Sequence, residues 1–280
     1  MNYFELPLEQ WTNTFVDDWF LPTFGNAFDS IGSVLNAFVD LVTDVLLFIP
    51  PELFTLLLVI LSWRVGGKGL AVFTFLGMLF IGSVDIWEES MHTLSIVIVS
   101  TFVSLLVGIP VGILSAMNNR VQSVVRPTLD FMQTLPSFVY LIPAVLLFGL
   151  GGVSAVIATF IFAAPPAVRM TNLGIRHVPK EVIEASKAFG STSKQLLFKV
   201  QLPLAVPSIM AGVNQTIMLS LSMAVIASMI GAPGLGATVL QAISRVNIGL
   251  GLVGGLGIVV LAIILDRITQ GIGQGQNNKS

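Results

Sequence analysis

The sequence lacks cysteine entirely and contains little charge. Without cysteine, disulfides, thiolate metal ligands and cysteine nucleophiles are all excluded. Only 10% of the 280 residues are charged, whereas a soluble globular chain carries about 25%. Hydrophobic residues make up 54%, and the mean hydropathy is +0.90. The polar surface is too small for a soluble enzyme, and the apolar content is too high for a disordered chain.

Motifs for chemistry at a phosphate or a metal are also missing. The sequence has no G-x-x-x-x-G-K-[ST] loop, H-E-x-x-H or G-x-S-x-G. The two histidines, His92 and His177, lie far apart, so no metal site is predicted. The first 63 residues contain eight acidic residues and no Lys or Arg, which argues against a nucleic-acid-binding arm. We therefore expect neither an enzyme nor a cofactor in this chain, and no nucleic-acid partner.

Long apolar segments dominate what is present. A bilayer-spanning helix needs about 20 mainly apolar residues, and in hydrocarbon each segment must satisfy its own backbone hydrogen bonds. These segments do not alternate as barrel strands do. The sequence therefore predicts an all-α polytopic membrane protein with about seven transmembrane helices. The predicted spans are 52–63 (extended by 48–51), 69–84, 91–117, 127–149, 151–168, which Pro165 and Pro166 should end, 204–230 and 247–265.

The distribution of Lys and Arg predicts the orientation. Short loops rich in Lys and Arg stay in the cytoplasm. Basic and non-basic loops alternate along the seven spans, and the most basic stretch, 169–203, holds six Lys or Arg. We expect a transmembrane domain over 50–267, an N-terminus outside the cell membrane and a cytoplasmic tail over 268–280.

The N-terminal segment, 1–49, differs in kind from the spans. Apolar residues recur at helical spacing over 26–49, while Asp29, Asp40 and Asp44 lie on the other side. Each central Asp would cost about 2.5–3.5 kcal/mol inside a span. We expect an external amphipathic helix that lies on the outer membrane surface. Packing on the helix bundle is an equally good alternative, and a spanning helix is a weaker one.

The stretch 169–203 is the one long polar segment between spans. Pro179 can start a helix that ends near Ala188, and Gly190 is a typical stop. A second helix is predicted over 194–200, capped by Ser191 or Ser193, and Pro203 should end the segment. The segment therefore reads as a helix, a glycine turn and a helix.

One pattern in this segment resembles a known motif. The pattern is E-A-S, three residues, G, nine residues and V-Q-L-P, and it resembles the EAA motif of ABC importer permeases. This sequence departs from that motif at two positions. Its third residue is Ser where the motif has Ala, and Val stands where the motif has Ile. Segments between 132 and 266, such as MQTLPSFVYLIPAVLLFGLG and FAAPPAVRMTNLGI, resemble the permease subunits of glycine betaine and proline betaine importers. The motif residues are Glu184, Ala185, Ser186, Gly190, Val200, Leu202 and Pro203.

The resemblance implies a type I ABC importer permease-like fold. In such a permease the motif forms a coupling helix that docks on an ATPase, and two ATPase copies bind ATP and Mg. An external substrate-binding protein delivers the solute to a permease homodimer in the cell membrane. The function implied is ATP-driven, alternating-access import of compatible solutes such as glycine betaine. Import of another small solute (choline or an amino acid) and an ion-coupled secondary transporter remain alternatives.

Polar residues within the spans are candidates for a translocation path. They serve equally well as hydrogen-bonding contacts between helices. Asp130 lies one turn inside the fourth span, near its cytoplasmic edge. We expect it either to extend toward the membrane surface or to pair with Arg126, four residues earlier. The candidate path residues are Gln133, Thr134, Ser137, Tyr140, Asn214 and Gln215.

Overall fold

The structure, a computed structural model, describes residues 7–277, with side chains up to 273. All regular elements in this part of the chain are helical. They are α1 (Leu8–Thr14), a π-helix (Phe15–Phe20), α2 (Leu21–Phe48), α3 (Pro51–Ser83), α4 (Trp87–Met117), α5 (Asn119–Thr134), a 3-10 turn (Ser137–Tyr140), α6 (Leu141–Phe148), α7 (Gly152–Arg176), α8 (Lys180–Ala188), α9 (Ser193–Leu196), a π-helix (Leu197–Gln201), α10 (Leu202–Ile226), a 3-10 turn (Ala227–Ile230), α11 (Leu235–Ser244) and α12 (Ile248–Asn277).

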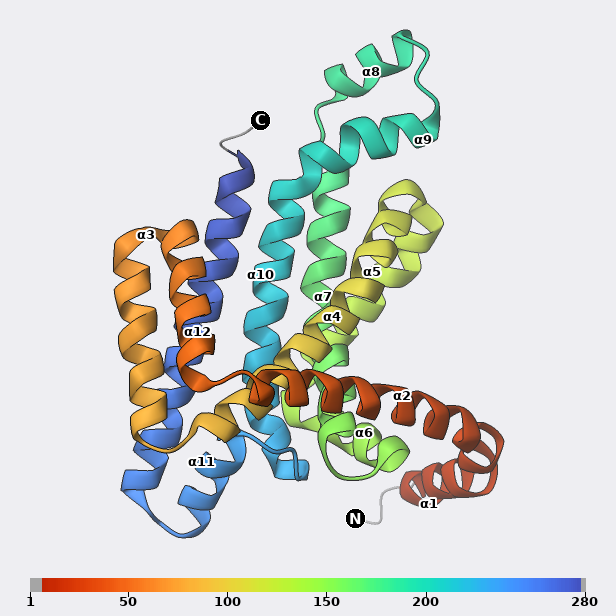
Figure 1. Ribbon diagram of the computed structural model, residues 1–280. Helices are drawn as coiled ribbons and strands as arrows, with labels where there is room; N and C mark the ends of the chain where they lie inside the picture. Colours follow the sequence, from red (N-terminus) through yellow and green to blue (C-terminus); the bar gives the residue numbers. More distant parts are fainter. Residues whose placement is uncertain (1–6, 278–280) are drawn as a thin grey trace, which may run out of the picture.

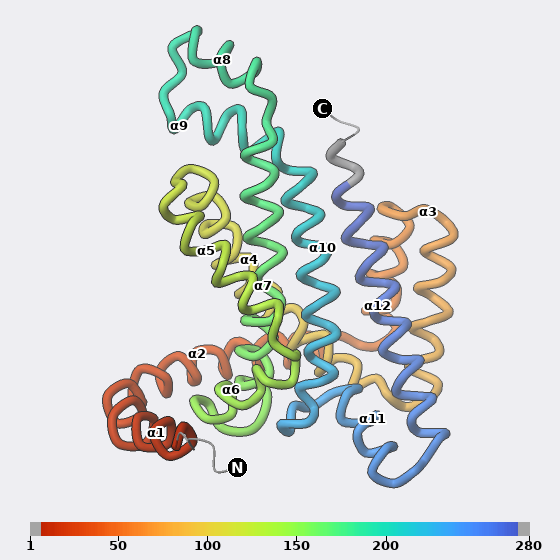
Figure 2. Tube along the Cα trace, turned by 180° about the vertical axis from the view of Figure 1, so that it is seen from behind, coloured from red at the N-terminus to blue at the C-terminus, as the bar shows by residue number. Residues whose placement is uncertain are grey.

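Two views show how these helices are arranged. Helices α7, α10 and α12 run side by side, and α8 and α9 project beyond one end of them (Figure 1). The C-terminal end of α12 lies toward the same end, whereas α1, α6 and α11 lie toward the other (Figure 2). Helix α2 runs across the long helices rather than along them, as both figures show. The fold therefore has two distinct ends.

Six helical stretches within the described residues are long and apolar enough to cross a membrane. A seventh crossing results if α5 and the bent segment Ser137–Phe148 count as one. This range confirms the predicted all-α fold with about seven transmembrane helices. The assignment of individual spans differs from the prediction at several places.

The first two predicted spans are the two arms of α3. Gly67 leaves the helical conformation, with φ 77° and ψ −171°, so the chain reverses there. The hydroxyls of Ser62 and Thr74 hydrogen-bond at 2.8 Å between the arms. Figure 1 shows the arms side by side at the edge of the bundle. The sequence predicted both arms correctly, because polar and glycine residues at the turn interrupt the apolar run.

The fourth predicted span, 127–149, consists of two helical segments at a sharp angle, in a region where Pro136 was expected to disturb the backbone. Helix α5 ends at Thr134, and the segment Ser137–Phe148 is bent from it by 110°. Leu135 is extended, with ψ 137°, because a residue before proline avoids the helical region. Pro136 therefore breaks the helix, and α6 lies at the end of the bundle opposite α8 (Figure 1).

The fifth predicted span was expected to end at Pro165 and Pro166, which is wrong. Helix α7 continues through both prolines to Arg176. Both prolines are buried, and an added Cβ at Gly212 of α10 would be 3.1 Å from the Pro166 carbonyl oxygen. Tight packing by neighbouring helices thus keeps the helix continuous where it lacks two backbone donors.

Two further boundaries differ from the prediction. Residues 169–176 belong to α7, and Leu202–Pro203 belong to α10. The segment between these two helices is therefore shorter than the predicted loop, 169–203. The predicted tail, 268–280, begins inside α12, which runs to Asn277, while residues 278–280 lie outside the described part. Helices α1 and α11 were not predicted, because both are shorter than the roughly 20 residues by which the spans were recognised.

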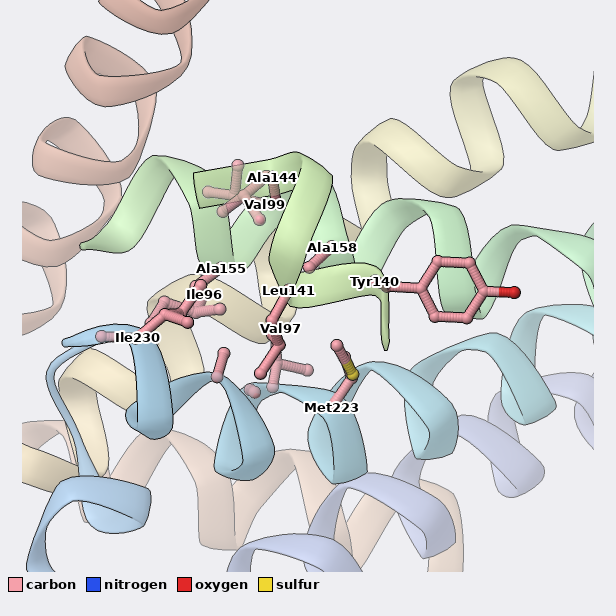
Figure 3. Close-up of a cluster of buried hydrophobic side chains, with 14 of the residues drawn as sticks. Ile96, Val97, Val99, Tyr140, Leu141, Ala144, Ala155, Ala158, Met223 and Ile230 are labelled. Carbon is pink, nitrogen blue, oxygen red and sulfur yellow. The ribbon is translucent and has the colours of Figure 1, made fainter. Parts of the chain in front are cut away.

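The central core joins α4, α7 and α10 with α6. Alanines and medium-sized residues fill it, and Figure 3 shows Ile96, Val97, Leu141, Ala158 and Met223 meeting there. Small residues bring α4 and α7 very close. A Cβ added at Gly108 would be 2.9 Å from that of Ala167. Close packing through small residues replaces the hydrophobic effect inside a bilayer.

Helix α2 packs on this core through its C-terminal half. Its buried residues are Val39, Thr43 and Leu46. The Thr43 hydroxyl donates to Ser95 Oγ of α4 at 2.8 Å, and that serine donates to the Val39 carbonyl at 3.1 Å. The acidic side, with Asp29, Asp40 and Asp44, stays exposed. Helix α2 therefore covers the segment predicted to be amphipathic, and its second half lies against the bundle. The stretch Leu8–Phe48 is also one of the six that are long and apolar enough to cross a membrane.

Candidate functional site

The α8–α9 loop is built from two well-defined caps. After α8, the Gly190 N–H donates to the Lys187 carbonyl at 2.9 Å, and the Ser191 N–H donates to the Ser186 carbonyl at 3.1 Å. Gly190 has φ 81°. This arrangement is a Schellman motif, which needs a left-handed residue and therefore favours glycine. The predicted glycine turn is present, and it fixes the angle between α8 and α9.

The second cap starts α9 at Thr192 rather than at the predicted serines. Thr192 Oγ1 accepts a hydrogen bond from the Gln195 N–H at 3.3 Å, and Gln195 Oε1 accepts one from the Thr192 N–H at 2.9 Å. This reciprocal pair is a capping box. It satisfies two N–H groups that would otherwise lack a partner, so α9 begins at a defined residue.

We expect Thr192→Ala to loosen α9 without unfolding the bundle. Loss of such a cap costs about 1 kcal/mol. Hydrogen exchange measured on the purified protein should therefore show about fivefold less protection of the α9 amides. Ser193→Ala is the matched control, because its hydroxyl makes no hydrogen bond within the described residues. Equal protection in both variants would contradict the assigned cap.

From α9 the helix continues into the bundle through a π-turn. The Leu202 N–H donates to the Leu197 carbonyl, a five-residue spacing. Pro203 and Pro207 lack N–H donors, and the helix shifts register over Leu197–Gln201 instead of ending. Ser193–Ile230 thus forms one helical stretch of 38 residues. Val200, Leu202 and Pro203 lie in this stretch, and none marks the end of the loop.

The exposed side of the loop carries the first part of the motif. Glu184 and Ala185 are exposed, and Ser186 is half-buried. Phe189, next to Gly190, is 92% exposed. Glu184 makes no ion pair within the described residues. The inner side is fixed to the bundle by Leu197, which packs against Ile175 and Ala205. The loop therefore presents a defined outer surface that the rest of the chain does not cover.

A cavity of about 570 Å³ opens between α5 and α7. Its wall is partly polar, and α4 and α10 contribute at its edge. The lining residues are Ser115, Gln122, Val125, Arg126, Leu129, Asp130, Gln133, Pro166, Val168, Arg169, Met170, Asn172, Leu173 and Gln215.

The ion pair in this cavity differs from the predicted one. Asp130 Oδ1 accepts a hydrogen bond from Arg169 Nη2 at 2.5 Å, whereas the sequence predicted either a pair with Arg126 or an Asp130 side chain that extends toward the membrane surface. Arg169 lies on α7 and its side chain reaches α5. Asp130 therefore pairs with an arginine of another helix and not with Arg126 of its own helix. Arg126 lines the cavity without an ion-pair partner in the described part of the chain.

Two of the six candidate path residues line the cavity, and the other four do not. Gln133 and Gln215 line the cavity. Thr134 donates to the Phe131 carbonyl, and Tyr140 is buried, with its hydroxyl on the Met132 carbonyl. Ser137 starts the 3-10 turn after the bend. None of these three, nor Asn214, lines the cavity.

Asn214 instead joins α10 to α12. Its amide donates to Asp266 Oδ1 at 3.1 Å, and its Oδ1 accepts from the Thr269 hydroxyl at 2.5 Å. Gln270 Nε2 donates to the same Asp266 oxygen at 2.7 Å. Sequence reasoning missed Asp266, because it stands near the end of an apolar segment. These contacts favour the helix-packing interpretation for Asn214.

Comparison with known proteins identifies the family. The family model described as "Binding-protein-dependent transport system inner membrane component" matches residues 108–277. The chain belongs to this family. The match contains α5, the cavity, the α8–α9 loop and the helices on both sides of it. This permease is therefore a multi-pass protein of the inner membrane, and the family implies an ATPase and a binding protein as partners.

Several curated relatives match the permease over nearly its whole length. It is 49% identical to the glycine betaine transport system permease protein OpuAB of Bacillus subtilis, over 95% of this chain and 94% of the relative. It is 46% identical to the glycine betaine/proline betaine permease protein ProW of Escherichia coli, over 98% and 77%. These relatives are transport subunits, in agreement with a permease that is not itself an enzyme.

A solved structure shares the fold. It is described as an inward-facing conformation of the MetNI methionine ABC transporter, and it matches with a TM-score of 0.63 at 23% identity. The match covers 68% of the permease and 95% of the solved chain. The type I ABC permease fold predicted from the sequence is thus confirmed.

Proposed function

We propose that this chain is the membrane-spanning permease subunit of an ATP-driven, binding-protein-dependent importer of compatible solutes such as glycine betaine. The observation that carries the solute assignment is the 49% identity, over 95% of the chain, to a permease named for glycine betaine transport. The family match and the α8–α9 loop support the mechanism.

The loop's connections explain how an external force could reach the cavity. Helix α7, which supplies Arg169 to the cavity wall, leads into α8 after three residues. Helix α9 is continuous with α10, which supplies Gln215. Displacement of the α8–α9 loop therefore moves two cavity-lining helices directly. Two ATPase copies that bind ATP and Mg would supply the displacement at Glu184, Ala185 and the exposed Phe189.

A second permease copy completes the proposed assembly. Binding of ATP would draw the two α8–α9 loops of a homodimer together and turn the cavity outward. Hydrolysis would reset it. The external binding protein would deliver the solute at the opposite end of the bundle, where α6 and α11 lie.

The proposed topology places α8–α9 and the C-terminus in the cytoplasm and α1 outside. Because the natural chain has no cysteine, single cysteines can report this directly. We expect Thr12→Cys to react with a membrane-impermeant maleimide in intact cells or spheroplasts. Ser193→Cys and Ser280→Cys should react only after the membrane is opened. The reverse pattern would contradict the orientation.

The solute is tested by uptake in a strain without its own compatible-solute importers. Expression of the permease with its ATPase and binding protein should give uptake of radiolabelled glycine betaine and growth at high osmolarity. An excess of unlabelled glycine betaine should block the uptake, whereas choline should compete weakly. Preferential uptake of choline or an amino acid would replace the assigned solute and keep the transport class.

A further inference from the structure

Helix α7 carries two arginines that hold the α4–α5 hairpin in different ways. They are seven residues apart and therefore share one face of the helix. Arg176 Nη2 donates to the Ser115 carbonyl at 2.9 Å and to Asn119 Oδ1 at 2.8 Å. Both partners lie at the turn between α4 and α5. Arg169 holds α5 further along, through Asp130 alone.

The contact of Arg169 is open to exchange. Its side chain is 41% exposed and that of Asp130 is 58% exposed, and both line the cavity. A guanidinium has five N–H donors, and the hydrogen bond to Asp130 is the one that Arg169 makes within the described residues. Arg169 therefore has free N–H donors for an oxygen ligand in the cavity, to which it can transfer from Asp130.

The cavity wall has the charge and polarity to bind a carboxylate. It holds two arginines, Arg126 and Arg169, and one aspartate, so it carries one more positive charge than negative. Ser115 also lines the cavity, and its hydroxyl is buried and has no hydrogen-bond partner among the described residues. A guanidinium binds a carboxylate with two parallel hydrogen bonds.

We propose that the cavity between α5 and α7 is a transient binding site for a zwitterionic solute, with Arg169 as the ligand of its carboxylate and Asp130 as the counter-charge of its ammonium. The proposal rests on the proposed function and names the site that the solute meets inside the permease. A zwitterion supplies one charge to each partner, so the Asp130–Arg169 pair exchanges its internal contact for two contacts with the solute.

The exchange has a structural consequence. Once Arg169 binds the solute, the Asp130 contact no longer ties this part of α5 to α7. Arg176 continues to hold the α4–α5 turn. Occupancy of the cavity would thereby loosen the C-terminal half of α5 and leave the α4–α5 turn fixed.

The test uses the complete importer reconstituted in lipid, with the permease labelled with ¹⁵N at arginine and glycine betaine labelled with ¹³C at its carboxylate. Solid-state NMR should show ¹³C–¹⁵N dipolar dephasing with saturating solute, and Arg169→Gln should abolish it. Loss of this charged contact should lower the maximal uptake rate about tenfold, while the affinity of the binding protein for the solute stays the same. Arg120→Gln, an exposed arginine of α5 outside the cavity, should behave as the natural protein in both assays.

Two results would overturn the site. One is unchanged dephasing in Arg169→Gln. The other is full recovery of uptake in the charge-swapped double variant Asp130→Arg with Arg169→Asp, since this would show that the pair only latches two helices. If the natural protein fails to transport glycine betaine at all, the proposed function fails instead, and the two failures are thus distinct.

Discussion

Replacing Gly190 with valine should lower ATP-driven uptake at least about tenfold, while the permease remains folded in the membrane. Gly190 has φ 81°, and an added Cβ would meet no atom within 4 Å, so the effect comes from the backbone alone. A left-handed conformation costs a residue other than glycine about 1–2 kcal/mol, and a β-branched residue more. The turn would therefore shift to another conformation and change the angle between α8 and α9.

Asparagine provides the matched control at the same position, because it tolerates the left-handed conformation. We expect Gly190→Asn to keep most of the uptake. Both variants should be present at normal levels in the membrane by immunoblot. In proteoliposomes, stimulation of ATP hydrolysis by the loaded binding protein should fall in parallel with uptake for Gly190→Val. Undiminished uptake in that variant would show that this turn does not transmit force.

Gly112→Ala should destabilise the bundle itself. An added Cβ would be 2.6 Å from Thr171 Cβ and 2.8 Å from the Val168 carbonyl oxygen. The carbonyl belongs to the α7 backbone, so it cannot be relieved by a change of rotamer, and α4 must move away from α7. Overpacking of this kind costs about 1–3 kcal/mol. We expect the thermal unfolding midpoint of the purified permease to fall by about 5 °C or more.

The control for this prediction is Gly255→Ala in α12, where an added Cβ would meet nothing within 4 Å. Both changes exchange glycine for alanine inside a long helix, so their effects on helix propensity should be similar. Only Gly112→Ala should lower the midpoint and the yield of monodisperse protein. Equal midpoints would mean that α4 and α7 do not pack as closely as described.

The features that sequence reasoning predicted depend on local patterns. Hydropathy alone predicted the arms of α3 and helices α4, α10 and α12, because a helix that crosses a bilayer must be long and apolar. The turn at Gly190 was predictable because its conformation requires a particular residue. The alternation of Lys and Arg predicts an orientation that the proposed topology retains.

The errors arose where distant parts of the chain decide the outcome. Pro165 and Pro166 looked like a helix end, and only the packing of α10 on α7 keeps the helix continuous. Asp130 has an arginine four residues earlier, yet its partner stands 39 residues later on α7. A local rule cannot rank these two partners, because the choice depends on how α5 bends and where it meets α7.

The same limit applies to the candidate path residues. Asn214 and Gln215 are neighbours in sequence, but successive positions of a helix point in directions about 100° apart. Gln215 therefore lines the cavity while Asn214 hydrogen-bonds to Asp266 of α12. Only the arrangement of helices separates a path residue from a packing residue.

The most direct test of the account is energised uptake by the complete importer in proteoliposomes of known orientation. ATP should be required on the side that carries the α8–α9 loop, and the loaded binding protein on the opposite side. Uptake of glycine betaine should then proceed at the same rate whether or not a proton gradient is present. Uptake that continues without ATP and follows the proton gradient would contradict a permease driven through the α8–α9 loop.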